Sequence, residues 1–354
     1  MSPNPLVGAV IVRDGQTIGE GFHAELGDLH AERAALADCR GRGEDPAGAT
    51  MYVTLEPCAH QGRQPPCVEA IIEAGVGRVV IASDDPSEKA AGRGPGILRD
   101  GGVEVAFATG AQATAARRLN QPFRKHARTG LPLVVLKMAM SLDGQTTTAP
   151  GDSPWISGPE SRELVHRWRA ESDAIAVGIG TALADDPLLT ARIDGARQPL
   201  RVVFDHHARL PLESQLLQTV DQAPVLVVAA PDAPSDRTSA LKEAGVEVLL
   251  TNGIEAALRE LGGRNITSFF LEGGKTLAAS FLAADQIDES RTFVAPMLLG
   301  EHEGARRAGP VSDAGLSLSG ESSASSPPAR GTALEATTTR VGEDTLITAR
   351  FKEW

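Results

Sequence analysis

The sequence predicts an α/β fold organised in two domains. Its 354 residues exceed what one average domain holds, since single domains usually have roughly 100–200 residues. Short apolar runs alternate with helix-like segments in both halves of the chain, which is the pattern of α/β proteins. A polar, Arg-rich stretch at 111–130 separates the halves and predicts a connecting helix. Hydrophobic residues make up 42% of the chain, which is enough to form packed cores.

The first half alternates strand and helix signals. The apolar run 7–12 predicts a strand, and the Arg13-Asp14-Gly15-Gln16 segment a hairpin-like turn after it. Alanines and a leucine at helical spacing predict a helix over 30–39. The later elements are expected to be strands at 49–55 and 78–82 and a helix at 67–74. We therefore expect a three-layer α/β sandwich.

The second half shows the same alternation. After Thr129-Gly130-Leu131-Pro132, strands are predicted at 133–137, 174–177, 201–204, 225–229, 246–249 and 268–271, and a closing strand at 345–351. The stretch 312–332 is rich in Ser, Gly, Ala and Pro and predicts a mobile loop. The predicted divisions are a first domain at 1–112, a connection at 113–130 and a second domain at 131–354.

Charge and cysteine content disfavour several functional classes. A net charge of −12 argues against tRNA or DNA as the main partner. Three cysteines are too few for a disulfide framework and favour the reducing cytoplasm. No apolar run of ~18 residues and no signal-peptide pattern is present, so we expect a soluble, unexported protein without membrane partners.

Zinc-binding residue types occur in a characteristic order in the first half. His30, Cys58 and Cys67 offer one imidazole and two thiolates, which leaves a fourth zinc position for water, as in catalytic sites. Glu32 supplies the acid/base that an activated water needs. The order matches the nucleobase-deaminase pattern H-x-E then P-C-x-x-C, although these cysteines are spaced as C-x8-C. The sequence therefore predicts a hydrolytic metal site.

Neighbouring residues are candidates for substrate contacts. His60 and Arg63 lie between the cysteines on a Gly- and Pro-rich loop and suit an anionic, hydrogen-bonding substrate. Asn4 lies between two prolines that stiffen it, so its amide suits a pyrimidine edge. An ordinary loop and turn are the alternative interpretations.

The second half lacks the G-x-G-x-x-G fingerprint after its predicted strands, so a nicotinamide cofactor would bind in another way. The segment 269–277 has the form of a strand, a glycine turn and a helix start, whose backbone N–H groups suit a phosphate. An ordinary strand-to-helix connection is the other interpretation.

The motifs SPNPLVGAVIV, HAE and TLEPCAHQGRQPPC resemble the bifunctional riboflavin-biosynthesis deaminase-reductase family. The resemblance covers nearly the whole chain, because KMAMSLDG, WIS and GIGTALADDPLLTAR resemble the family's reductase domain. It implies a cytidine-deaminase-like α/β/α domain followed by a dihydrofolate-reductase-like α/β domain. The implied reactions are zinc-dependent deamination of 2,5-diamino-6-(5-phosphoribosylamino)pyrimidin-4(3H)-one and then NADPH-dependent reduction of the ribosyl chain to ribityl phosphate.

By matched position, the resemblance also implies a role for each candidate residue. The zinc ligands would be His30, Cys58 and Cys67, Glu32 would shuttle protons, and the substrate would face Asn4, His60 and Arg63. NADPH would contact Ala139, Trp155, Thr181, Asp185, His206 and Gly274. The reductase substrate would contact Ser153, Arg169, Leu189, Arg192 and Glu272, with Lys137 as a further polar partner at the sugar. A guanidinium pairs well with a phosphate, which suits Arg169 and Arg192.

Both halves depart from the family pattern, and the departure at the start of the chain leaves an alternative open. The chain begins at Met1-Ser2-Pro3-Asn4, where the family has a preceding helix, and Met297 stands where the family usually has Lys. A missing helix would expose apolar surface, so one alternative is that only the reductase half is active. The others are a zinc nucleoside or tRNA deaminase, and a non-enzymatic zinc-stabilised protein; the acidic charge disfavours a tRNA substrate, and Glu32 disfavours a structural site. We expect a homo-oligomer.

Overall fold

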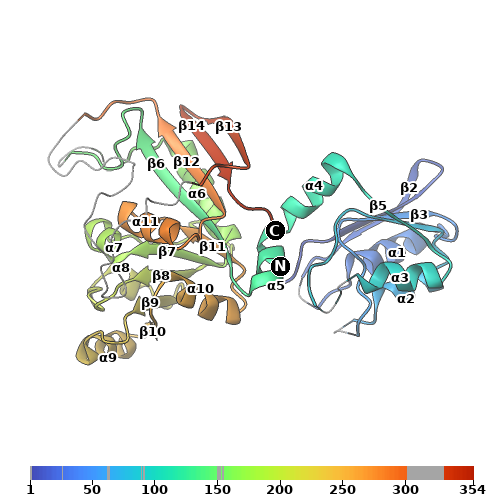
Figure 1. Cartoon of the computed structure of the whole chain (residues 1–354), viewed down its shortest axis with the longest axis horizontal. Helices are drawn as coiled ribbons and strands as arrows, with labels where there is room; N and C mark the ends of the chain where they lie inside the picture. The colour runs from blue at the N-terminus through green and yellow to red at the C-terminus, as the bar shows by residue number, and fades with distance from the viewer. Residues whose placement is uncertain are drawn as a thin grey trace. The chain divides into compact units, whose positions relative to one another are not determined.

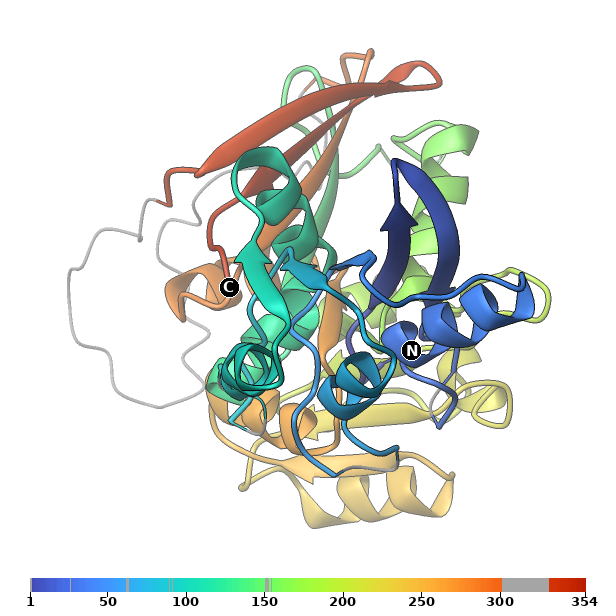
Figure 2. The same cartoon turned by 90° about the vertical axis from the view of Figure 1, so that its right-hand side faces the viewer.

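The computed structural model describes residues 2–25, 27–61, 64–88, 90, 92–149, 153, 155–300 and 331–354. The chain divides into two compact units, one formed by Met1–Gly130 with Trp354 and the other by Leu131–Glu353 (Figure 1; turned by 90° in Figure 2). Both are built from helices and a central sheet, so the predicted α/β class is confirmed. Within the described ranges, no helix is long and apolar enough to cross a membrane. The loop predicted at 312–332 falls, up to residue 330, outside the described residues.

A five-stranded sheet in the order β2-β1-β3-β4-β5 forms the centre of the first unit. The antiparallel hairpin of β1 (Gly8–Arg13) and β2 (Gln16–Phe22) turns at Asp14 and Gly15, whose φ angles of 50° and 77° are left-handed. β1 is also antiparallel to β3 (Thr50–Val53), whereas β3, β4 (Arg78–Ile81) and β5 (Glu104–Phe107) run parallel. Helices α1 (Ala31–Gly41), α2 (Cys67–Glu73) and α3 (Arg93–Asp100) lie side by side along one face (Figure 1).

Helix α1 rests directly on β2 because two glycines of the strand leave room for it. A Cβ at Gly21 would lie 2.3 Å from the backbone nitrogen of Ala35 and 2.7 Å from the carbonyl oxygen of Ala31. A Cβ at Gly19 would lie 2.6 Å from the carbonyl oxygen of Ala35. Any side chain at these positions would push the helix away from the sheet. This close packing fixes the start of α1, where His30 and Glu32 lie.

The connecting helix predicted at 111–130 is two helices, α4 (Gly110–Leu119) and α5 (Gln121–Thr129). The chain leaves helical geometry at Asn120, where φ is −112° and ψ is 20°. The Asn120 carboxamide accepts a hydrogen bond from the Leu6 backbone N–H at 2.7 Å and donates one to the Leu6 carbonyl at 2.8 Å. The break therefore ties the two helices to the segment that carries Asn4.

A nine-stranded sheet in the order β10-β9-β8-β7-β11-β6-β12-β14-β13 forms the second unit. The parallel strands are β6 (Leu133–Ser141), β7 (Ala174–Gly178), β8 (Leu200–Phe204), β9 (Val225–Ala229), β10 (Glu247–Leu250), β11 (Ser268–Leu271) and β12 (Glu289–Ala295). β14 (Asp344–Arg350) and β13 (Glu335–Val341) add an antiparallel edge. The helices are α6 (Pro159–Glu171), α7 (Ile179–Asp185), α8 (Gln215–Gln218), α9 (Ser235–Glu243), α10 (Ile254–Gly263) and α11 (Lys275–Ala283).

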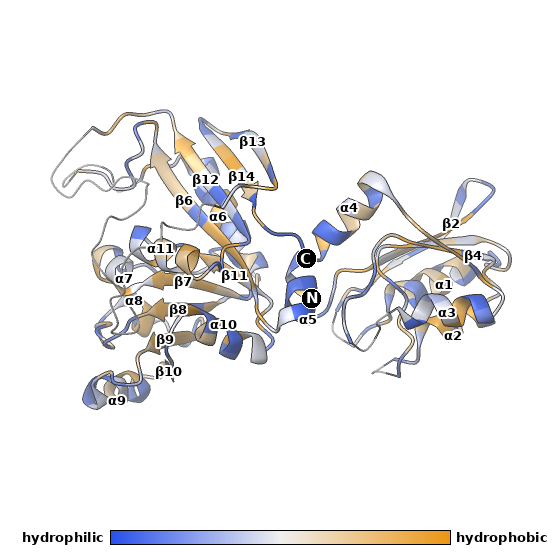
Figure 3. Cartoon of the chain, in the orientation of Figure 1, coloured by the Kyte–Doolittle hydropathy of each residue, from blue (hydrophilic) through white to orange (hydrophobic). Residues whose placement is uncertain are grey.

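The central strands of this sheet are buried on both faces. Alternate residues of the central strands enter two separate core clusters; for example, Ile175 and Val203 belong to one and Ala176 and Val202 to the other. Parallel sheets covered on both faces have continuous apolar strands, which appear in orange in Figure 3. The strands at 225–229 and 268–271 are therefore found with the predicted bounds.

Candidate active sites

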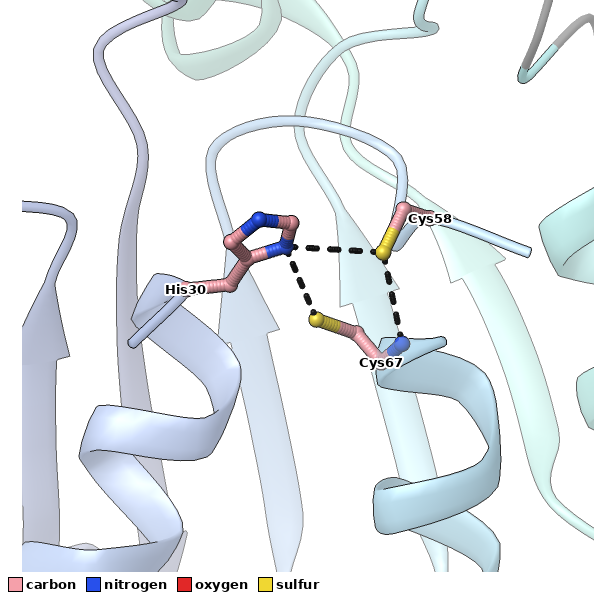
Figure 4. Close-up of side chains that lie close together, drawn as sticks. All are labelled: His30, Cys58 and Cys67. Atoms are coloured by element: carbon pink, nitrogen blue, oxygen red, sulfur yellow. Dashed lines mark hydrogen bonds between the residues drawn. The ribbon is translucent and has the colours of Figure 1, made fainter. Parts of the chain in front are cut away.

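The three predicted zinc ligands meet at one point of the first unit (Figure 4). His30 is the N-cap of α1, Cys67 is the first residue of α2, and Cys58 lies in the loop after β3. The Sγ atoms of Cys58 and Cys67 lie 3.5 Å and 3.4 Å from the Nδ1 atom of His30. No other such group of possible metal ligands occurs in the part of the chain that the structure describes.

The spacing of these donor atoms fits a zinc ion. With Zn–S and Zn–N bonds of about 2.3 Å and 2.1 Å, tetrahedral coordination places a sulfur and a nitrogen ligand about 3.6 Å apart. The observed separations of 3.4 Å and 3.5 Å are close to this value. Hydrogen bonds from Cys67 and His30 lower the pKa of the Cys58 thiol to about 4. Cys58 is thus predisposed to the thiolate form that binds metals.

Glu32 lies in the first turn of α1 and is only 3% exposed. Burial raises the pKa of its carboxyl group to about 7, and the same group interacts with the Cys67 thiol. A carboxyl group with a pKa near neutrality both takes up and returns a proton at neutral pH. Glu32 can therefore exchange a proton near neutral pH beside the three candidate ligands.

Asn4 is held beside these ligands by a histidine that sequence reasoning missed. The Nδ2 atom of Asn4 lies 3.1 Å from the Nε2 atom of His23. The Nδ1 atom of His23 lies 3.1 Å from the carbonyl oxygen of Leu29, which can only accept a hydrogen bond. His23 therefore donates through Nδ1 and accepts from Asn4 through Nε2. The His23 ring also meets the His30 ring edge-on at 5.4 Å between centroids.

The two remaining candidates of the first unit lie on the loop between the cysteines. His60 is partly buried close to Asp85, and its Nδ1 atom has no hydrogen-bond partner among the described residues. A ligand could satisfy this atom, which fits the predicted substrate contact. Arg63 lies outside the described residues.

A cluster of charged side chains lies in the second unit. Arg169 on α6 donates its Nε and Nη2 hydrogens to the two carboxylate oxygens of Glu272, at 2.7 Å and 3.0 Å. Lys137 on β6 is near the same carboxylate; burial lowers the pKa of Lys137 and Glu272 opposes that shift. Burial raises the pKa of Glu272, but Arg169 and Lys137 together hold it below its ordinary value. The site thus holds the Glu272 carboxyl group against Arg169 and near Lys137.

His166, one turn before Arg169 on α6, belongs to the same cluster. Burial lowers the pKa of this histidine, and so do the nearby cations of Arg169 and Arg192. Its Nδ1 atom is buried and has no hydrogen-bond partner in the described part of the chain. The sequence offered one signal, the i, i+3 spacing that puts His166 and Arg169 on one helix face.

Three of the predicted cofactor contacts follow parallel strands at their carboxyl ends, where open α/β sheets bind ligands. Thr181 follows β7, His206 follows β8, and Gly274 follows β11 as the N-cap of α11. A Cβ on Gly274 would lie 3.3 Å from the Oγ1 atom of Thr181, so the chain passes this threonine closely. The Nδ1 atom of His206 is buried without a partner among the described residues. These features fit a phosphate-bearing cofactor.

The other predicted contacts of the second unit have fewer interactions with one another. Ala139 lies on β6, and the Oγ atom of Ser153 accepts the Trp155 backbone N–H at 3.3 Å. The exposed Trp155 ring has the Arg162 guanidinium 5.0 Å from its centroid. No side-chain hydrogen bond joins these residues to the charged cluster within the described ranges. The end of α7 and the segment after it carry the remaining predicted contacts, Asp185, Leu189 and Arg192.

Known families match both units. The cytidine and deoxycytidylate deaminase zinc-binding region matches residues 1–83, and the RibD C-terminal domain matches residues 132–325. The first match includes all three predicted zinc ligands and Glu32. The second begins at the first strand of the second unit.

Similar proteins match the chain over most of its length. The riboflavin biosynthesis protein RibD of Actinobacillus pleuropneumoniae is 40% identical over 84% of this chain and 80% of its own. The RibD of Escherichia coli is 40% identical over 84% of this chain and 83% of its own.

Solved structures are similar over both units. An Acinetobacter baumannii RibD structure has 38% identity and a TM-score of 0.80, covering 99% of this chain and 93% of that one. A Thermotoga maritima diaminohydroxyphosphoribosylaminopyrimidine deaminase/5-amino-6-(5-phosphoribosylamino)uracil reductase has 34% identity and a TM-score of 0.80, with the same coverage. The chain belongs to the RibD family of riboflavin biosynthesis proteins.

Proposed function

We propose that the chain catalyses two consecutive steps of riboflavin synthesis. The first unit, with its functional part at 1–112, would deaminate 2,5-diamino-6-(5-phosphoribosylamino)pyrimidin-4(3H)-one by hydrolysis. The second, at 131–354, would reduce the ribosyl chain of the product with NADPH. The observation that carries the proposal is the convergence of His30, Cys58 and Cys67 beside the buried Glu32, in a chain whose other unit matches the RibD C-terminal domain.

For the deamination, the chain's residues hold the metal, move protons and orient the ring. The ligands His30, Cys58 and Cys67 would hold zinc, which when bound makes water nucleophilic near neutral pH. Glu32, with a pKa near 7, takes a proton from the attacking water and returns it to the departing amine. We assign Asn4, His60 and Arg63 to the substrate. The bond to His23 orients the Asn4 amide, and this supports its role in reading the ring.

For the reduction, bound NADPH supplies the hydride and the chain supplies orientation. We assign the cofactor to Ala139, Trp155, Thr181, Asp185, His206 and Gly274. The unpartnered Nδ1 of His206 and the close passage of Gly274 past Thr181 support this assignment. The substrate is assigned to Lys137, Ser153, Arg169, Leu189, Arg192 and Glu272. The Arg169–Glu272–Lys137 cluster supports this assignment, because the cations suit a phosphate and the carboxylate can accept hydrogen bonds from sugar hydroxyls.

Two measurements on the purified full chain test the proposal. The diaminopyrimidine substrate should release ammonia without NADPH, and NADPH should then be consumed by the deaminated product. Ammonia release that requires NADPH, or NADPH consumption before any ammonia appears, would contradict the proposed order. Reduction without deamination would leave only the second unit active. All three cysteines are free thiols, which supports action in the reducing cytoplasm.

A further inference from the structure

The segment 186–192, between α7 and β8, has an unusual backbone. Three of its residues that are not glycine have left-handed φ angles: Asp186 at 38°, Leu189 at 54° and Arg192 at 53°. Side chains with a Cβ disfavour this conformation, so the surrounding structure must impose it. Strain of this kind is found at functional sites, and Arg192 is one of the residues assigned above to the substrate.

Side chains from outside the segment hold it through backbone atoms. The Nη1 group of Arg201 on β8 donates to the carbonyl oxygen of Leu188 at 3.0 Å. The Nη1 group of Arg169 donates to the carbonyl oxygen of Thr190 at 3.2 Å. The Oε1 atom of Gln198 accepts the backbone N–H of Ala191 at 2.9 Å. Side chains thus hold the backbone at three of the four residues that precede Arg192.

A further bond holds the start of the segment. The side-chain Nε2 group of Gln215, at the start of α8, donates to the carbonyl oxygen of Asp186 at 2.6 Å. The Gln215 backbone N–H donates to the Asp186 carboxylate at 2.9 Å. Both ends of the strained segment are therefore restrained by contacts with neighbouring elements.

Arg201 holds the segment from a fully buried position, which is uncommon for an arginine. It is 0% exposed, and its guanidinium donates to the carbonyl oxygens of Leu188, Leu216, Thr219 and Ala223 and to the Thr219 hydroxyl. No carboxylate forms an ion pair with it among the described residues, and burial lowers its pKa to about 10. Burying a cation without a carboxylate partner costs free energy, which these hydrogen bonds must offset, so the buried arginine calls for an explanation.

We propose that Arg201 and Gln198 are positioning residues of the reductase, which hold segment 186–192 in its strained form so that Arg192 meets the substrate's phosphate. The inference rests on the proposed function, since that assigns Arg192 to the substrate. Both residues contact the backbone of this segment, and neither is assigned to the substrate or the cofactor. Their effect should therefore fall on substrate binding and leave the hydride-transfer step nearly intact.

The test uses two matched substitutions in the full chain. Gln198→Met keeps the length of the side chain but removes the acceptor for the Ala191 N–H, whereas Gln198→Glu keeps an acceptor. At saturating NADPH, Gln198→Met should raise the KM for the deaminated substrate about tenfold and leave kcat within about twofold, the pattern of lost uniform binding. Gln198→Glu should keep KM within about threefold of the wild-type value.

If Arg201→Met folds, it should raise KM at least as much as Gln198→Met does. If it does not fold, the comparison of Gln198→Met with Gln198→Glu tests the proposal by itself. Ammonia release by the first unit serves as an internal control and should not change in any variant. An unchanged KM in Gln198→Met, or an equal rise in Gln198→Met and Gln198→Glu, would overturn the positioning role. A wild-type chain that does not reduce the substrate would instead refute the proposed function.

Discussion

The Arg169–Glu272 ion pair yields a stability prediction whose size follows from its geometry. Glu272→Gln keeps the shape of the side chain but removes the negative charge that faces Arg169 and Lys137. Removing one partner of a buried pair costs about 3–5 kcal/mol. The two side chains are 12% and 9% exposed, so water still reaches them slightly. We therefore expect the lower end, about 3 kcal/mol, and a smaller loss in the double variant with Arg169→Met.

The pH dependence of this loss follows from the pKa shift. The pKa of Glu272 is lowered from 4.5 in the folded protein, so its carboxylate stabilises the fold fully above pH 4.5. That contribution is lost as the pH falls through the lower, folded-state pKa. The difference between wild type and Glu272→Gln should therefore shrink at acidic pH.

Denaturant unfolding followed by tryptophan fluorescence measures these effects, because Trp168, one of the three tryptophans, is buried against Phe270 and Phe293 in the second unit. Glu255→Gln is the matched control, since it breaks an exposed pair with Arg259 and should cost less than about 1 kcal/mol. Equal losses for Glu272→Gln and the control, or a loss that does not change between neutral and acidic pH, would refute the reasoning.

Three further predictions concern the first unit. Glu32→Gln should lower ammonia release about 10²–10⁴-fold and leave reduction of the deaminated substrate unchanged in a coupled NADPH assay; equal loss of both would refute two separate sites. Cys58→Ser should lose zinc and ammonia release together, as measured by elemental analysis, and full zinc retention would contradict its role as a ligand. Gly21→Ala should destabilise this unit by about 3 kcal/mol, since its Cβ would lie 2.3 Å from a backbone nitrogen of α1. Gly41→Ala, with open space around its Cβ, is the control and should be near neutral in a thermal melt.

Buried strands were the elements that sequence reasoning located best. Strands such as 225–229 are continuous apolar runs because both faces of their sheet are covered, and such runs are plain in the sequence. The edge strand β13 was missed because its Thr337, Thr338 and Thr339 are exposed and carry no apolar pattern. β12 was missed as well, since it opens with the polar run Glu289-Ser290-Arg291. The break at Asn120 depends on a bond to distant Leu6, which a local pattern does not contain.

The sites likewise contain residues that a local sequence pattern reveals and residues that depend on distant contacts. The candidate zinc ligands could be found because each lies in a motif at the start of a helix or in the loop before one, and the structure brings them together. His23 and Arg201 have no motif, and their positions depend on contacts with residues far along the chain. Such supporting residues become visible only when the fold is known.

The most direct test of the two-site mechanism is to measure zinc content and ammonia release in one preparation purified without chelators. We expect about one zinc per chain and ammonia release from the diaminopyrimidine in the absence of NADPH, followed by NADPH consumption when the cofactor is added. A preparation without zinc that still releases ammonia, or one with zinc that releases none, would contradict the assignment of His30, Cys58, Cys67 and Glu32 to the deamination.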